Sequence, residues 1–84
     1  MYRIHFTKKA ANFIRKLDKI NQERISKKID ELKNNPELGV PLTGNLAGLW
    51  KLRIGDYRAI YQIIHNEFII LILRLRHRKN AYDF

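Results

Sequence analysis

Two stretches of alternating apolar and polar residues flank the pair Gly55-Asp56 and predict a β-hairpin in the middle of the chain. Before the pair, residues 49–54 alternate so that Trp50, Leu52 and Ile54 share one side. After it, residues 57–64 alternate in the same way. Because side chains alternate across a strand, each strand has one mostly apolar face. A Gly-Asp pair between two such runs is a strong hairpin signal.

Apolar residues at helical spacing predict two helices ahead of this hairpin. Residues 7–17 read as the first helix, with Thr7 as its N-terminal cap, and Asn21 is a candidate cap for the second. The second helix ends near Pro36, because the residue before a proline disfavours helical geometry. The two apolar stripes consist of Ala10, Phe13, Ile14 and Leu17, and of Ile25, Ile29 and Leu32. Two helices joined so closely form an antiparallel helical hairpin.

Two further strands and one long loop complete the expected order β-α-α-β-β-β. Residues 2–6 read as a short first strand at a sheet edge, and residues 68–78 as the last strand, after a turn at residues 65–67. Residues 37–47 read as an irregular loop. The prediction is an α+β domain of two layers, in which the N-terminal helical hairpin packs on one face of an antiparallel sheet.

The last strand is expected to alternate between a core face and an open face. Leu71, Leu73 and Leu75 fall on one side, and the arginines between and after them fall on the other. One core between sheet and helices is expected from nine residues: Phe13, Ile14, Leu17, Ile29, Leu32, Trp50, Leu52, Tyr61 and Leu73.

The opposite faces of the three C-terminal strands share a single sign of charge. Six cations are expected there: Lys51, Arg53, Arg58, Arg74, Arg76 and Arg78. Asp56 and Glu67 lie at the turns, away from the centre of this face. A solvated outer face normally mixes both signs, so a face of one sign on rigid strands favours phosphate binding. The assignment depends on register, because a slip of one residue would turn every side chain over.

Composition narrows the classes of protein without deciding between them. Eighty-four residues are expected to form one domain, residues 1–84. A formal charge of +9 indicates a polyanionic partner, nucleic acid first and an acidic protein second. The chain has no cysteine, which fits the reducing cytoplasm, and its longest apolar run is too short to span a membrane. The histidines and glycines match no metal or nucleotide motif, so neither a metal nor a cofactor is expected.

Two segments of the chain resemble the RelE-type toxins of the RelE/ParE superfamily. They are LTGNLAGLWKLRIGDYRAIYQI, residues 42–63, and RLRHRKNAY, residues 74–82, and the likeness extends over the two leading helices. The hairpin motif is typical of the superfamily. An His-Arg pair with a tyrosine four residues after the arginine, here His77, Arg78 and Tyr82, is typical of its RNA-cleaving branch.

The resemblance implies a toxin of a toxin–antitoxin pair that cleaves mRNA in the ribosomal A site without a metal. The RNA 2′-hydroxyl attacks the neighbouring phosphate and leaves a 2′,3′-cyclic phosphate. The implied partners are the ribosome, mRNA and an acidic, partly disordered antitoxin similar to RelB, all in the cytoplasm. The implied catalytic residues are Lys51, Arg58, Arg78 and Tyr82. Arg53, Arg74 and Arg76 are expected to bind RNA.

The residues leave several roles and one alternative function open. Some RelE toxins carry a second lysine where this chain has Leu49, so part of its charge is expected from Arg53 or Arg76. Tyr82 can stack on a base or take the proton of the 2′-hydroxyl, and His77 is a further proton carrier that alternation turns toward the core. The alternatives are a ParE-like toxin that acts on a protein such as DNA gyrase, and a non-catalytic nucleic-acid-binding module.

Overall fold

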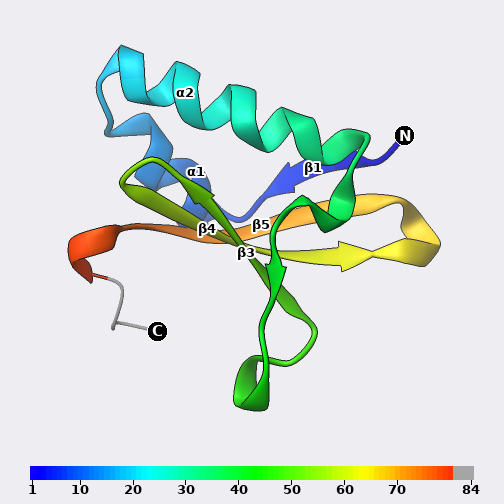
Figure 1. Cartoon of the computed structure of the whole chain (residues 1–84). Helices are drawn as coiled ribbons and strands as arrows, with labels where there is room; N and C mark the ends of the chain where they lie inside the picture. The colour runs from blue at the N-terminus through cyan, green and yellow to red at the C-terminus, as the bar shows by residue number, and fades with distance from the viewer. Residues whose placement is uncertain (81–84) are drawn as a thin grey trace.

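The computed structural model describes residues 1–80 and has the expected two layers. Two helices, α1 (Lys8–Arg15) and α2 (Lys19–Asp30), cover one face of a five-stranded sheet (Figure 1). The strands are β1 (Arg3–Phe6), β2 (Val40–Pro41), β3 (Leu49–Ile54), β4 (Tyr57–Ile64) and β5 (Ile69–His77). The α+β class and the helical hairpin on one face are therefore confirmed. Within residues 1–80, no helix is both long and apolar enough to cross a membrane.

The sheet is mixed, whereas the sequence predicted an antiparallel one. Its strand order is β1-β5-β4-β3-β2, and β1 pairs with β5 in parallel. The two tight connections β3–β4 and β4–β5 reverse the chain twice, so β5 runs in the same direction as β3. Between the helices and β3 the chain passes through β2, which is antiparallel to β3, so the connection from β2 to β3 gives β3, and therefore β5, the direction of β1. The expected loop at residues 37–47 also contains β2, which pairs with β3 at Lys51 and Trp50.

The helix caps match one prediction and correct another. The Thr7 hydroxyl accepts a hydrogen bond from the Ala10 amide and begins α1, as expected. Asp18, rather than Asn21, caps α2: its carboxylate accepts from the Asn21 amide at 3.3 Å. The Asn21 side chain donates to the same carboxylate at 2.7 Å, which holds the pKa of Asp18 below its ordinary value. A carboxylate at this place also suits the positive end of the helix dipole.

The core lies between the helices and the sheet, with one error in the expected membership. Leu52, Tyr61, Ile29 and Leu32 are buried, and four more expected residues pack against them: Phe13, Ile14, Leu17 and Trp50. Leu73 does not belong to this core, and Ile70 and Ile72 take its place. Leu75 is buried as expected, but Leu71 lies opposite Gln62, on the open face.

A β-bulge at Leu73 explains the error. Tyr61 pairs with Ile72, and the preceding residue Ile60 pairs with Arg74, so Leu73 is an extra residue in β5. A bulge of this kind reverses the alternation of side chains beyond it. Residues 70 and 72 therefore face the core before the bulge, and residue 75 faces it afterwards. The Leu73 carbonyl accepts a hydrogen bond from the Thr7 hydroxyl at 2.7 Å, which ties the bulge to the start of α1.

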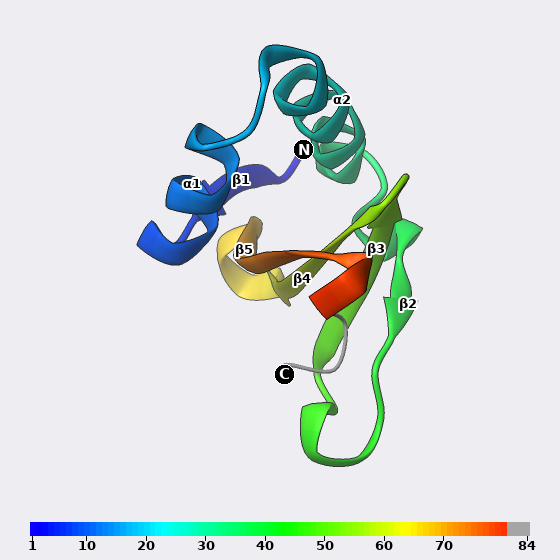
Figure 2. The same ribbon diagram turned by 90° about the vertical axis from the view of Figure 1, so that its left-hand side faces the viewer.

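The connection from β2 to β3 extends away from the helices. Figure 2 shows it as the green segment that passes beyond the sheet on the side opposite α1 and α2. Among residues 1–80, no α-helix covers the other face of the sheet, which we call the open face. This open face carries every side chain of β3, β4 and β5 that alternates away from the core.

The bulge gives a test of the face assignment. Deleting Leu73 turns β5 into a regular strand in which Ile72 and Leu75 still face the core and Arg74 still faces outward. We expect this variant to fold and to lose about 1 kcal/mol, the contribution of the hydrogen bond from Thr7. Urea unfolding followed by circular dichroism measures the change.

Deletion of Leu75 is the matched control, because it removes one leucine from the same strand. It turns an arginine into the core in either register, with or without the bulge. An uncompensated buried charge costs roughly 3–5 kcal/mol, a large share of the stability of a small domain. A folded Leu75 deletion beside an unfolded Leu73 deletion would contradict the assignment.

Candidate functional site

Three arginines form a row across the open face. Arg53 of β3 lies directly opposite Arg58 of β4, and Arg58 lies directly opposite Arg76 of β5. Adjacent strands are roughly 4.8 Å apart, so the row spans about 10 Å. Like charges directly opposite one another destabilise a sheet. Such a row therefore indicates a site for an anion that several guanidinium groups bind together.

A second row next to the arginines adds two cations around an apolar residue. Lys51 lies opposite Ile60, and Ile60 lies opposite Arg74. Ile60 is only 2% exposed although it points away from the helices. The long aliphatic stems of Lys51 and Arg74 are suited to cover it. Within the described strands, this face carries no acidic residue between the cations.

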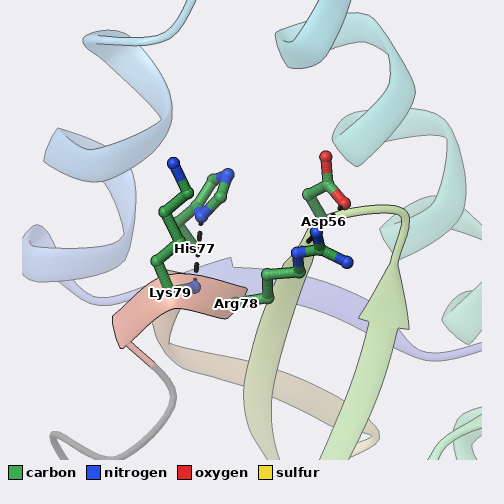
Figure 3. Close-up of polar contacts among 4 residues, drawn as sticks. All are labelled: Asp56, His77, Arg78 and Lys79. Atoms are coloured by element: carbon green, nitrogen blue, oxygen red, sulfur yellow. Dashed lines mark hydrogen bonds and ion pairs between the residues drawn. The ribbon is translucent and has the colours of Figure 1, made fainter.

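Arg78 lies apart from these rows. It follows the end of β5 in a short 3-10 turn, and its side chain points to the β3–β4 turn, where its Nε atom is 3.7 Å from the Asp56 carboxylate (Figure 3). Its amide also donates to the Asp56 carbonyl oxygen at 2.7 Å. The side chains of Arg78 and Asp56 are 60% and 63% exposed, and exposed ion pairs of this kind contribute little to stability. Arg78 can therefore exchange the carboxylate for a phosphate.

His77 lies on the helix side of the sheet, as alternation predicts. Its ring packs edge-on against Tyr57, with ring centroids 5.2 Å apart. Its Nδ1 atom accepts a hydrogen bond from the Lys79 amide at 3.2 Å (Figure 3). The ring is thus directed away from the arginine row, which argues against His77 as the proton carrier for a phosphate bound there.

A buried tyrosine holds the segment before β2 against the sheet beside Lys51. The Tyr61 hydroxyl donates to the Pro36 carbonyl oxygen at 2.7 Å and accepts from the Gly39 amide at 3.0 Å. Gly39 approaches β3 so closely that a Cβ at this position would overlap the Lys51 carbonyl oxygen. Only glycine fits there. Burial raises the pKa of Tyr61.

The structure thus brings five of the predicted site residues together and separates the others. The five are Lys51, Arg53, Arg58, Arg74 and Arg76. Arg78 lies at the hairpin tip, and Tyr82 lies outside the described residues. Among residues 1–80, no three His, Cys, Asp or Glu side chains are grouped to hold a metal ion.

Sequence reasoning missed three features of the site. The contact of Asp56 with Arg78 joins groups 22 positions apart, and no local pattern announces it. The burial of Ile60 was not expected on the open face, where its neighbours on the adjacent strands are Lys51 and Arg74. The fit of Gly39 against Lys51 follows from β2, a strand too short to be found from alternation.

Comparison with known proteins identifies the class of protein. The family model described as the ParE toxin of the type II toxin–antitoxin system parDE matches residues 4–82. Toxin RelE of Mycobacterium tuberculosis is 34% identical over 96% of this chain and 86% of its own length. Toxin RelG of the same organism is 32% identical over 96% of this chain and 95% of its own length.

Solved structures agree with this result. The toxin–antitoxin complex RelBE2 from M. tuberculosis contains a chain that matches with a TM-score of 0.84 and 32% identity, over 92% of this chain and 98% of that one. The archaeal RelE–RelB complex from Pyrococcus horikoshii matches with a TM-score of 0.74 and 31% identity, over 92% and 94%. The chain therefore belongs to the ParE toxin family, within the RelE/ParE superfamily that its motifs resemble. It is a toxin of the type II toxin–antitoxin class.

The hydroxyl of Tyr61 gives a prediction about the wall of the site. Tyr61→Phe leaves the Gly39 amide and the Pro36 carbonyl without their partner, so we expect a loss of roughly 1–3 kcal/mol in urea unfolding. Tyr57→Phe is the matched control, because within the described residues the Tyr57 ring has packing contacts but its hydroxyl has no hydrogen bond. Equal losses of stability in Tyr61→Phe and Tyr57→Phe would contradict the role of the Tyr61 hydroxyl in holding this segment.

The comparison of the wild type with Tyr61→Phe also predicts a pH dependence of stability. Burial raises the pKa of Tyr61 in the folded state above its ordinary value of about 10. The contribution of the neutral hydroxyl to the free energy of unfolding is therefore complete below about pH 10. It is lost as the pH rises through the folded-state pKa. The difference in stability between the wild type and Tyr61→Phe should therefore shrink above pH 10.

Proposed function

We propose that this toxin is a ribosome-dependent mRNA endonuclease, which stops translation by cutting mRNA in the A site. The observation that carries the proposal is the row Arg53, Arg58 and Arg76, with Lys51 beside it. A phosphate placed on this row contacts several donors that the rigid strands hold in position. The names of the relatives at 32–34% identity, Toxin RelE and Toxin RelG, support the same branch of the superfamily.

The proposed reaction is an attack by the 2′-hydroxyl of the RNA on its own neighbouring phosphate. The 2′-oxygen gives its proton to a base, for which the sequence suggests Tyr82, and bonds to phosphorus, while the bond from phosphorus to the 5′-oxygen breaks. The products are a 2′,3′-cyclic phosphate and a 5′-hydroxyl, which receives a proton. Negative charge grows on the non-bridging oxygens in the transition state, and preorganised guanidinium groups stabilise it. As the resemblance implies, no metal takes part.

The residues divide this work according to their positions. Arg58 is in the middle of the row and is half-buried, so it is the best placed to bind the scissile phosphate bidentately. Lys51, next to the row on β3, is suited to give a proton to the 5′-oxygen. Arg78 can turn from Asp56 to the phosphate, because that ion pair is exposed. For Tyr82 the sequence alone suggests a role, as stacking partner or base.

A toxin of this class needs a cognate antitoxin, and the proposal includes an acidic, partly disordered RelB-like protein as its partner. The solved structures that this chain resembles include the toxin–antitoxin complex RelBE2 and the archaeal RelE–RelB complex. The charge of +9 favours an acidic protein. A disordered segment that folds on binding can cover a large surface of the toxin and keep it inactive.

A second candidate function is supported by the family model itself. That model is described by ParE, and residues 4–82 match it. In this alternative the chain inhibits a protein target such as DNA gyrase, and the cations of the open face bind that target. The two functions differ in one respect that can be measured, which is whether mRNA is cut.

Arg58→Ala provides the sharpest test of the proposed site. The loss of one preorganised donor to a developing negative charge commonly lowers a rate on the order of 100- to 1000-fold. We expect this loss in single-turnover cleavage of ribosome-bound mRNA. The fold should be retained, because Arg58 faces away from the core. Lys16→Ala, an exposed residue after α1, is the control with the same change of charge and should cleave like the wild type.

Two results would count against the proposal. Cleavage by folded Arg58→Ala at the wild-type rate would remove the arginine row from the mechanism. The absence of cleavage by the wild type, together with inhibition of gyrase supercoiling, would favour the ParE-like alternative.

A further inference from the structure

A basic groove runs from the arginine row around the edge of the sheet to α2. β2 covers β3 only at Trp50 and Lys51, so no described strand pairs with the outer edge of β3 at residues 52–54. Two hollows lie along this edge, of about 420 Å³ and about 390 Å³. Lys28 and Arg53 line both of them, so the two hollows adjoin each other at these residues, and we call them together the groove.

The groove is strongly cationic along its whole length. Five cations line it against one acid, Glu31, and they are Arg24, Lys27, Lys28, Lys51 and Arg53. Glu31 lies 3.6 Å from Lys28 and offsets part of that charge. Arg24 reaches across from α2 to the hairpin tip, where its Nη1 atom would be 3.7 Å from a Cβ at Gly55. The charge of the open face therefore continues onto the helical layer.

The ends of the groove indicate what it binds. One end is Lys51, which also flanks the row where we place the scissile phosphate. From Lys51 to the turn at Gly55 the strand rises roughly 13 Å, enough for about two to four nucleotides. No aromatic side chain of the described residues lines either hollow, so within this part of the chain the groove offers cations for a backbone but no ring on which a base could stack.

We propose that this groove binds the phosphate backbone of the RNA strand that flanks the cut. The inference rests on the proposed function in one respect, since it takes the RNA to be held at the arginine row. Arg24, Lys27 and Lys28 then position the strand by charge without reading its sequence. An acidic protein segment is the competing occupant, but its carboxylates would have to match cations at both ends of a groove that opens into the arginine row.

The test compares two variants of equal charge. The groove variant is Arg24→Gln/Lys27→Gln/Lys28→Gln, and the control is Lys8→Gln/Lys16→Gln/Lys19→Gln on exposed positions elsewhere on the helices. The probes are 2′-O-methyl oligouridylates of about 4 and about 14 nucleotides, lengths at the two ends of the range of single-strand sites. Fluorescence anisotropy gives their affinities over a series of salt concentrations, with circular dichroism to verify the fold.

We expect the groove variant to bind the long probe about 10- to 50-fold more weakly than the wild type, with a salt slope smaller by about 2. The short probe should bind the groove variant and the wild type with the same affinity. The control should change the affinity for the long probe by less than about threefold, because its charges lie farther away and are screened. Equal losses in the two variants, or an unchanged affinity of the groove variant for the long probe, would overturn the proposal.

Two further measurements distinguish RNA binding in the groove from binding of a protein segment, and from failure of the proposed catalytic function. A groove variant that keeps its RNA affinity but loses affinity for the antitoxin would overturn it in favour of a protein occupant. Cleavage of ribosome-bound mRNA by the wild type is measured in parallel. If cleavage is absent while the groove variant still loses affinity for the long probe, the groove stands and only the catalytic function fails.

Discussion

The bulge at Leu73 determines which side chains of β5 face the core and which face solvent. Ile70 and Ile72 face the helices before it, and strict alternation would turn Arg74 and Arg76 into the same apolar layer. The extra residue reverses the phase, so Leu75 enters the core and the arginines join the open face. The carbonyl of the bulged residue is bound by the Thr7 hydroxyl, and Thr7 also caps α1. Strand, helix and cationic face thus depend on one local irregularity.

The cationic face carries a local cost in stability. Arg58 lies directly opposite Arg53 on one neighbouring strand and Arg76 on the other, and like charges in such pairs destabilise a sheet. The apolar side of the same strands offsets this repulsion, because it buries Leu52, Tyr61 and Leu75 against the helices. An anion bound between these guanidinium groups would relieve the repulsion, as the proposed binding of an RNA phosphate requires. Natural proteins commonly keep such local conflicts at functional sites.

The sequence predicted much of the fold because its strongest signals are local. Alternation around Gly55-Asp56, the Thr7 cap and the helical stripes each depend on neighbouring residues, and all of them were confirmed. The parallel pairing of β1 and the short β2 depend on distant partners, and alternation cannot reveal them. In β5 the sequence correctly predicted that Arg74 and Arg76 face away from the core. The same alternation was continued back through the bulge, so Leu73 was wrongly placed in the core.

The candidate site was predictable to the extent that it lies on regular strands. Lys51, Arg53 and Arg58 needed only the hairpin register. The contact of Arg78 with Asp56 and the groove between α2 and β3 needed the tertiary structure, because each joins segments that are separate in sequence. Arg24, Lys27 and Lys28 of α2 join the cationic surface only because the fold places them beside Arg53.

The proposed reaction at the cationic face requires the 2′-hydroxyl of the RNA as its nucleophile. The most direct measurement replaces the nucleotide on the 5′ side of a mapped cut by its 2′-deoxy form in an mRNA bound to ribosomes. The account predicts that cleavage at this position disappears, while the unmodified mRNA is cut to a 2′,3′-cyclic phosphate. Cleavage that persists at the 2′-deoxy position would contradict it.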